Sequence, residues 1–61
     1  MLTTRGYMAV RQGDHEWLDT SSYSCLLEEC RRKARALDKR IPHYSNANPV
    51  VRFVQVEIIE V

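Results

Sequence analysis

The segment YSCLLEECRRKARALDKRI, which runs from Tyr23 to Ile41, decides the fold. Apolar side chains recur in it at steps of four, three, four, three and four residues. Residues at such steps share one face of an α-helix, because one helical turn takes about 3.6 residues. The segment therefore predicts an amphipathic helix over residues 22–41, and its apolar stripe is formed by Tyr23, Leu27, Cys30, Ala34, Leu37 and Ile41.

Both ends of this segment carry helix signals. The side chains of Asp19–Ser22 can accept hydrogen bonds from the first amides of the helix. Pro42 disfavours helical geometry in the residue before it and so predicts the end of the helix. Two pairs of opposite charge lie four residues apart in the favourable order, Glu28–Arg32 and Glu29–Lys33.

The segments on either side of the helix predict β-structure. Residues 3–19 hold an apolar run at 7–10 and a turn with Gly13, which predicts a hairpin whose glycine has positive φ. Residues 42–49 are rich in Pro, Ser and Asn and predict a loop. Residues 50–61 alternate as a strand. The face expected to pack on the helix carries Val54, Val56 and Ile58.

The element order β-β-α-β constrains the topology. The helix carries the chain back, so the second and third strands should run in the same direction, with the first strand between them. We therefore expect an α+β two-layer sandwich over residues 1–61. It would have a three-stranded antiparallel sheet of order 2-1-3 and one helix on one face.

Composition excludes several classes of protein. The chain has 61 residues, 44% of them hydrophobic and 28% charged, with a formal net charge of +1. This size leaves no room for a cofactor-binding fold with a substrate pocket, so we expect one small domain without enzymatic activity or cofactor. No apolar run is long enough to span a membrane, and residues 1–10 do not predict a signal peptide. The normal apolar content argues against disorder.

The cysteines and histidines do not predict a metal or catalytic site. Cys25 and Cys30 lie five residues apart, diverge on a helix and match no redox or zinc spacing, so they are expected to be reduced thiols of a cytoplasmic protein. His15 and His43 fall in the expected turn and loop. We therefore predict no metal site and no nucleophilic pair.

A two-layer sandwich leaves one sheet face and the edge of the last strand uncovered. The apolar anchors expected there are Tyr7, Trp17, Phe53 and Ile59. One hypothesis is that a host protein or a second copy of the chain covers this surface. The alternative is that Phe53 and Ile59 are ordinary scattered surface residues.

The charges are divided unevenly along the chain. Residues 1–30 carry a net charge of −3 and residues 31–61 a net charge of +4. The bases of the predicted helix could bind phosphate groups of nucleic acid, and the candidates are Arg31, Arg32, Arg35, Lys39 and Arg40. Alternatively, these bases form a solvated face that pairs with Glu28, Glu29 and Asp38. No helix-turn-helix or zinc-finger spacing indicates sequence-specific recognition of DNA.

In overall style the chain resembles the very short accessory proteins of phages and prophages. The resemblance is carried by the opening Arg5–Arg11, the turn with Gly13, the capped basic helix and the terminal strand at 50–61. It implies a non-enzymatic protein that binds and modulates a host macromolecule. The first functional hypothesis is therefore a small interaction protein, and the second is a nucleic-acid binder that uses the basic helix.

Overall fold

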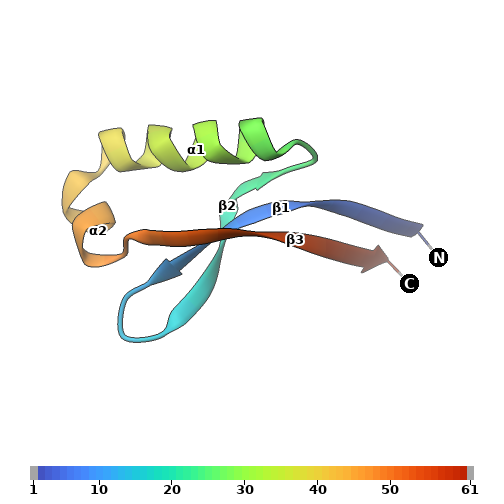
Figure 1. Cartoon of the computed structure of the whole chain (residues 1–61), viewed down its shortest axis with the longest axis horizontal. Coiled ribbons are helices and arrows are strands. Elements are labelled where there is room, and N and C mark those ends of the chain that lie inside the picture. Colours follow the sequence, from blue (N-terminus) through green and yellow to red (C-terminus); the bar gives the residue numbers. More distant parts are fainter. Residues whose placement is uncertain (1, 61) are drawn as a thin grey trace.

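The computed structural model describes residues 2–60 and has two layers, a three-stranded sheet and a helical layer on one of its faces (Figure 1). The strand order is β2-β1-β3, and β1 is antiparallel to both neighbours. This confirms the predicted fold class and strand order. The elements are β1 (Leu2–Gln12), β2 (Glu16–Ser24), α1 (Leu27–Arg40), α2 (Pro42–Ala47) and β3 (Val50–Glu60).

The main helix begins later than its sequence signals indicate. Strand β2 continues to Ser24, and α1 starts at Leu27 after an N-cap, Leu26, whose side chain makes no capping bond. The expected capping residues are engaged in the sheet instead. The Ser22 hydroxyl donates to the Asp19 carbonyl and accepts a hydrogen bond from the Ala9 amide. Tertiary contacts therefore take the side chains that could have capped an earlier helix start.

The residues after α1 are helical, which corrects the prediction of a loop over 42–49. Helix α1 ends at Arg40 as Pro42 predicts, but Pro42 also occupies the first turn of α2. Proline is favoured there because the first amides of a helix have no partner inside the helix. The amide of Ser45 bonds to the Ile41 carbonyl and that of Asn48 to the Tyr44 carbonyl, which closes the short helix.

The hairpin turn lies at residues 13–15, as predicted, but no described glycine has positive φ. The special feature of Gly13 is instead a close approach. A Cβ atom at Gly13 would stand 2.6 Å from Oδ1 of Asn48, so the missing side chain makes room for the residue that follows α2.

The helical layer covers the face of β3 opposite to the expected one. Ala9, which is fully buried, pairs with Phe53, and partners in an antiparallel ladder project from the same face. The guanidinium of Arg31, on α1, lies 5.7 Å from the centre of the Phe53 ring, so this is the face toward the helix. Val54, Val56 and Ile58 were predicted to face α1. That prediction is wrong, because these three residues lie on the uncovered face.

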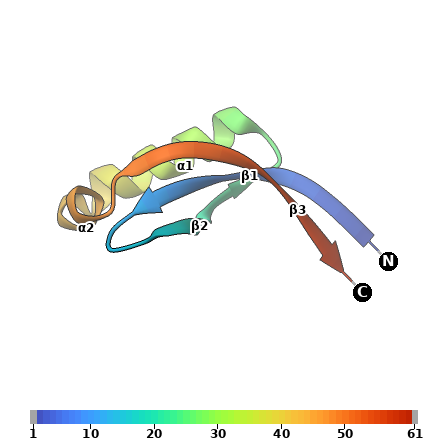
Figure 2. The ribbon, with the colours of Figure 1, turned by 60° about the horizontal axis from the view of Figure 1, so that its bottom comes forward.

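The sheet extends beyond its helical cover. Figure 2 shows α1 and α2 on one side of the sheet, while the paired outer ends of β1 and β3 continue past the helix. Strand β3 ends at Glu60, and Val61 of the predicted strand lies outside the described residues. The buried core is small: its apolar members are Ala9, Val10, Cys30 and Ala34, and its polar members are Arg11, Asp19 and Ser22.

Candidate nucleic-acid interface

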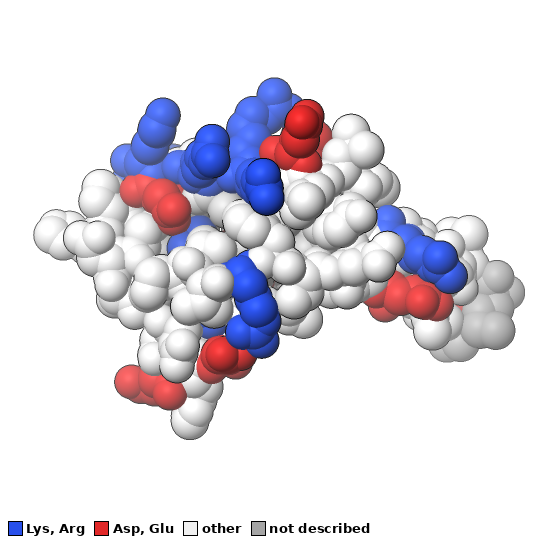
Figure 3. Space-filling model, in the orientation of Figure 1, with Lys and Arg blue, Asp and Glu red and all other residues white. Residues whose placement is uncertain are grey.

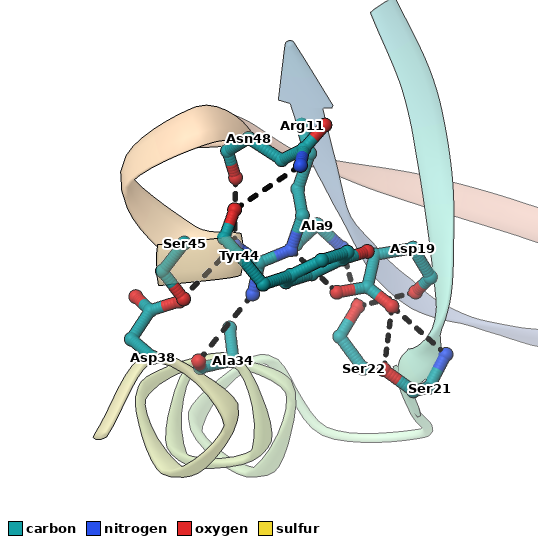
Figure 4. Close-up of polar contacts among 10 residues, drawn as sticks. All are labelled: Ala9, Arg11, Asp19, Ser21, Ser22, Ala34, Asp38, Tyr44, Ser45 and Asn48. Carbon is teal, nitrogen blue, oxygen red and sulfur yellow. Dashed lines mark hydrogen bonds and ion pairs between the residues drawn. The ribbon is translucent and has the colours of Figure 1, made fainter. Parts of the chain in front are cut away.

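An arginine occupies the centre of the molecule. The Arg11 side chain is fully buried, and its Nε atom donates to Oδ2 of Asp19 at 2.6 Å. Its Nη1 atom lies 2.9 Å from the Asn48 carbonyl and 3.1 Å from Oδ1 of Asp38, while Nη2 lies 3.5 Å from the Ala34 carbonyl (Figure 4). One guanidinium thus joins β1 to β2, to α1 and to the end of α2.

One aromatic ring, that of Tyr44, covers this guanidinium. The ring centre of Tyr44 lies 5.7 Å from the Arg11 carbon Cζ, a cation–π arrangement, and Trp17 meets the Tyr44 ring edge-on at 6.2 Å. The Ser45 hydroxyl donates to Oδ1 of Asp38 at 2.7 Å. Helix α2 therefore completes the enclosure of Arg11, which explains why a polar segment after Pro42 packs against the sheet.

Both partners of the buried ion pair are held charged. Burial opposes the charge on Arg11, but hydrogen bonds and the charges of Asp19 and Asp38 outweigh it and raise the Arg11 pKa above its usual value. Burial likewise opposes the charge on Asp19. Hydrogen bonds from Ser21 and Arg11 reverse that effect and lower the Asp19 pKa. The pair is therefore ionised throughout the physiological range.

The inward contacts of Asp38 change the charge balance on the outside of α1. A shallow groove runs along the exposed side of this helix, and we call it the α1 basic groove. Figure 3 shows basic side chains gathered over α1 on this side of the molecule. The groove is lined by Glu28, Arg31, Arg32, Arg35, Ala36 and Lys39.

Three bases of the α1 basic groove lack a carboxylate partner within residues 2–60. Arg32 pairs with Glu29, three residues earlier. No carboxylate of the described chain lies within ion-pair distance of the others, which are Arg31, Arg35 and Lys39. Arg31 and Lys39 are eight residues apart, which corresponds to about 12 Å along a helix. The groove therefore presents a short row of three bases without ion-pair partners, and the carboxylate of Glu28 is the one acidic group in its lining.

The two predicted i,i+4 pairs do not form, and the Glu29–Arg32 pair replaces them. Lys33 instead donates from Nζ to the Tyr23 carbonyl at 2.7 Å, which ties α1 to the end of β2. Arg40 lies on a different flank of α1, beside Lys33 and Ser21. The structure thus brings four of the five predicted nucleic-acid residues into one groove and separates Arg40 from them.

The residues predicted to anchor a partner on the uncovered sheet face do not form one patch. The expected position is wrong for Phe53 and Trp17, which lie on the face toward the helices. Trp17 pairs with Arg11 in the sheet, whereas Ile59 pairs with Thr3, eight residues along β1. That separation is about 26 Å at 3.3 Å per residue. Trp17 packs on α2, Tyr7 and Phe53 are half-buried, and Ile59 is exposed on the extended end of β3. Whether any of these residues binds a protein stays a prediction.

The structure also places the cysteines and the other possible metal ligands of the described residues. Cys25 is exposed and Cys30 buried, and both are free thiols, as predicted. Residues 2–60 hold no group of three or more side chains placed to bind a metal ion. Among these residues, no helix is both long and apolar enough to cross a membrane.

The central role of Arg11 was not foreseen from the sequence, although a signal for it exists. Arg11 directly follows the apolar run of residues 7–10, and Asp19 stands in the facing strand of the predicted hairpin. A charged residue that continues a buried strand requires an opposite charge nearby.

Comparison with protein-family models, curated proteins and solved structures found no match to this chain.

Proposed function

We propose that this chain is a small non-enzymatic protein that binds the phosphate backbone of nucleic acid through the α1 basic groove. The observation that carries the proposal is the inward position of Asp38. Because Asp38 pairs with buried Arg11, it does not neutralise the outer side of α1. Arg31, Arg35 and Lys39 are left without carboxylate partners in the described chain.

The chemistry of the groove fits phosphate better than base edges. Two of its three uncompensated bases are arginines, whose planar donors match phosphate oxygens. The groove is shallow, and helix α1 lies flat on the sheet rather than protruding from it (Figure 1). Contacts to phosphate position a protein on the duplex without reading sequence. Binding should therefore be sequence-independent and strongly weakened by salt.

Nucleic acid is favoured over an anionic membrane surface. Helices that lie in a membrane interface place an apolar face among the lipids beneath their basic residues. In α1 the apolar stripe packs against the sheet, where Cys30 and Ala34 are buried. The lining of the α1 basic groove includes only one apolar side chain, Ala36. Helix α1 therefore has charge for a phosphate surface but no apolar face available for insertion.

Binding can be tested with a fluorescently labelled DNA duplex and fluorescence anisotropy over a range of salt concentrations. The double variant Arg35→Gln/Lys39→Gln should bind more weakly. It should also lower the slope of log K against log salt by about two, since each lost phosphate contact removes about one. Oligonucleotides of unrelated sequence should give the same result as the first duplex.

The matched control is Arg5→Gln/Arg40→Gln, which removes the same charge from exposed side chains outside the α1 basic groove. It should keep the wild-type slope. If both variants lose affinity equally, net charge rather than the groove governs binding, and the proposal is wrong. Binding to anionic vesicles or to an acidic protein in preference to the duplex would also overturn it.

The broader prediction of a phage or prophage factor that modulates a host macromolecule stays a prediction. Under the proposal made from the α1 basic groove, the host macromolecule would be a nucleic acid. The support is physical and comes from charge placement, exposure and the contacts that occupy Asp38.

A further inference from the structure

Strand β3 is an edge strand whose outer side has no neighbouring strand in the described chain. It has β1 as its single neighbour in the sheet, and α1 packs mainly on β1 and β2. Its pairing with β1 is regular from Arg52 to Glu60, after one irregularity near Val51. This stretch contains no proline and no lysine, and the charges on it are those of Arg52, Glu57 and Glu60.

The other edge of the sheet is better protected. The pairing of β2 with β1 jumps from Ser24 opposite Tyr7 to Asp19 opposite Ala9, which is a bulge or a larger irregularity. Bulges interrupt the row of backbone groups that a further strand would need. A further strand could therefore form a regular row of backbone hydrogen bonds with β3, whereas the row on β2 is interrupted.

We infer that a second copy of this chain pairs with β3, antiparallel, about a two-fold axis at Val56. The result is a continuous six-stranded sheet in the order β2-β1-β3-β3-β1-β2. This inference goes beyond the proposed nucleic-acid binding and stands on separate observations. These are the regular open edge of β3 and the self-complementary order of its side chains.

The side chains match in this one register. Charged ends meet opposite charges, apolar residues meet apolar residues, and an amide meets a carboxylate. The pairs are Arg52–Glu60, Phe53–Ile59, Val54–Ile58, Gln55–Glu57 and Val56–Val56. Such cross-strand matches are the main source of sheet stability and specificity.

Neighbouring registers match less well. A two-fold axis perpendicular to a sheet keeps each residue on its own face, so the possible centres on this strand are single residues. An axis at Gln55 would place Arg52 against Ile58 and Phe53 against Glu57. An axis at Glu57 would place two glutamates against each other, which is unfavourable.

The same register joins the uncovered faces. Arg52 pairs with Val10 and Val54 with Met8, so the even-numbered residues of β3 lie on the face away from α1. Ile58 is 45% exposed in the single chain. In the dimer, the Val54–Ile58 pairs flank the central Val56 pair and form a continuous apolar strip across the axis.

The test measures the mass of the full chain in solution by light scattering and sedimentation, together with charge-swapped variants. The wild-type chain should form a dimer as its concentration rises. Arg52→Glu alone places glutamates against each other across the axis and also removes the pair that Arg52 forms with Glu16 within the chain. Glu60→Arg alone places arginines against each other. Each single variant should therefore be monomeric.

An equimolar mixture of the two single variants should form a heterodimer, because every Arg–Glu contact between the two copies is then restored. The double variant R52E/E60R should again form a homodimer. These rescues show that the single variants are folded and that the register is the stated one. Val56→Lys should abolish the dimer, whereas Val51→Lys, outside the paired stretch, should not.

A wild-type chain that is monomeric up to about 1 mM would overturn the inference. A dimer that survives Val56→Lys, or single variants that are not rescued by mixing, would overturn it equally, because association would then use another surface. None of these results depends on nucleic acid, so the proposed function and the dimer can fail separately.

Discussion

Arg11 is the residue on which the packing of this small domain depends. It is fully buried and contacts β2, α1 and the end of α2 through one guanidinium. A chain of this size has a small apolar core and a thin margin of stability. The buried ion pair with Asp19 is the feature that fixes how the layers meet.

Arg11→Met should unfold the protein or nearly so. The substitution removes one partner of a buried pair and leaves the Asp19 carboxylate uncompensated, which costs about 3–5 kcal/mol. That loss is comparable to the stability expected of a domain this small. Urea unfolding followed by circular dichroism measures it. Arg5→Met, at an exposed residue, should leave the midpoint nearly unchanged, and equal effects of the two substitutions would contradict the central role of Arg11.

The pKa of Asp19 predicts a loss of stability in acid. Because the folded state lowers this pKa, the ionised carboxylate stabilises the fold above the unfolded value near 3.8. Stability should hold from neutral pH down to that value and fall as the pH drops through the lower folded pKa. Thermal unfolding across the acid range measures the effect. Asp19→Asn should be less stable at neutral pH and lose less on acidification, and an unchanged acid transition would contradict this assignment.

At the scale of elements, the sequence predicted that α1 and β3 form, but it did not predict where α1 starts or which face of β3 packs on it. The apolar stripe of α1 was recognised, and Cys30 and Ala34 are buried as expected. The start of α1 was misplaced because Asp19 and Ser22 are engaged by residues distant in the sequence. The alternating pattern of β3 showed which residues share a face. Both faces carry apolar residues, so the pattern did not show which one packs on α1. The pairing register shows that it is the face with Phe53.

The two glycines give a prediction about elements. A Cβ at Gly6 would stand 2.7 Å from the backbone oxygen of Ser24 and 2.5 Å from the Tyr23 ring, so β1 and β2 would have to separate. At Gly13 the closest atom ends the flexible side chain of Asn48. Gly6→Ala should therefore cost about 1–3 kcal/mol, and Gly13→Ala should cost clearly less. Denaturant midpoints of the two variants provide the measurement, and the reverse order would contradict the account of both glycines.

At the scale of the whole molecule, the net charge is near neutral, but the acidic and basic side chains are distributed unevenly. Asp19 and Asp38 are directed inward to Arg11, and the uncompensated bases lie outside on α1. The uneven charge was visible in the sequence, whereas the inward position of Asp38 depends on the tertiary contacts of Arg11 and Ser45. A dimer through β3 would place both α1 helices on the same side of one sheet, because a perpendicular two-fold axis preserves the faces.

The salt dependence of duplex binding tests the central claim most directly. With three phosphate contacts per α1 basic groove, log K should fall with log salt at a slope of about −2.7 for one groove, since each contact contributes about −0.9. A dimer that engages both grooves should give about twice that slope. The measurement is a titration of the labelled duplex between about 50 and 200 mM salt. A slope in this range supports the account, and no binding at the lowest salt, or binding that salt does not weaken, would contradict it.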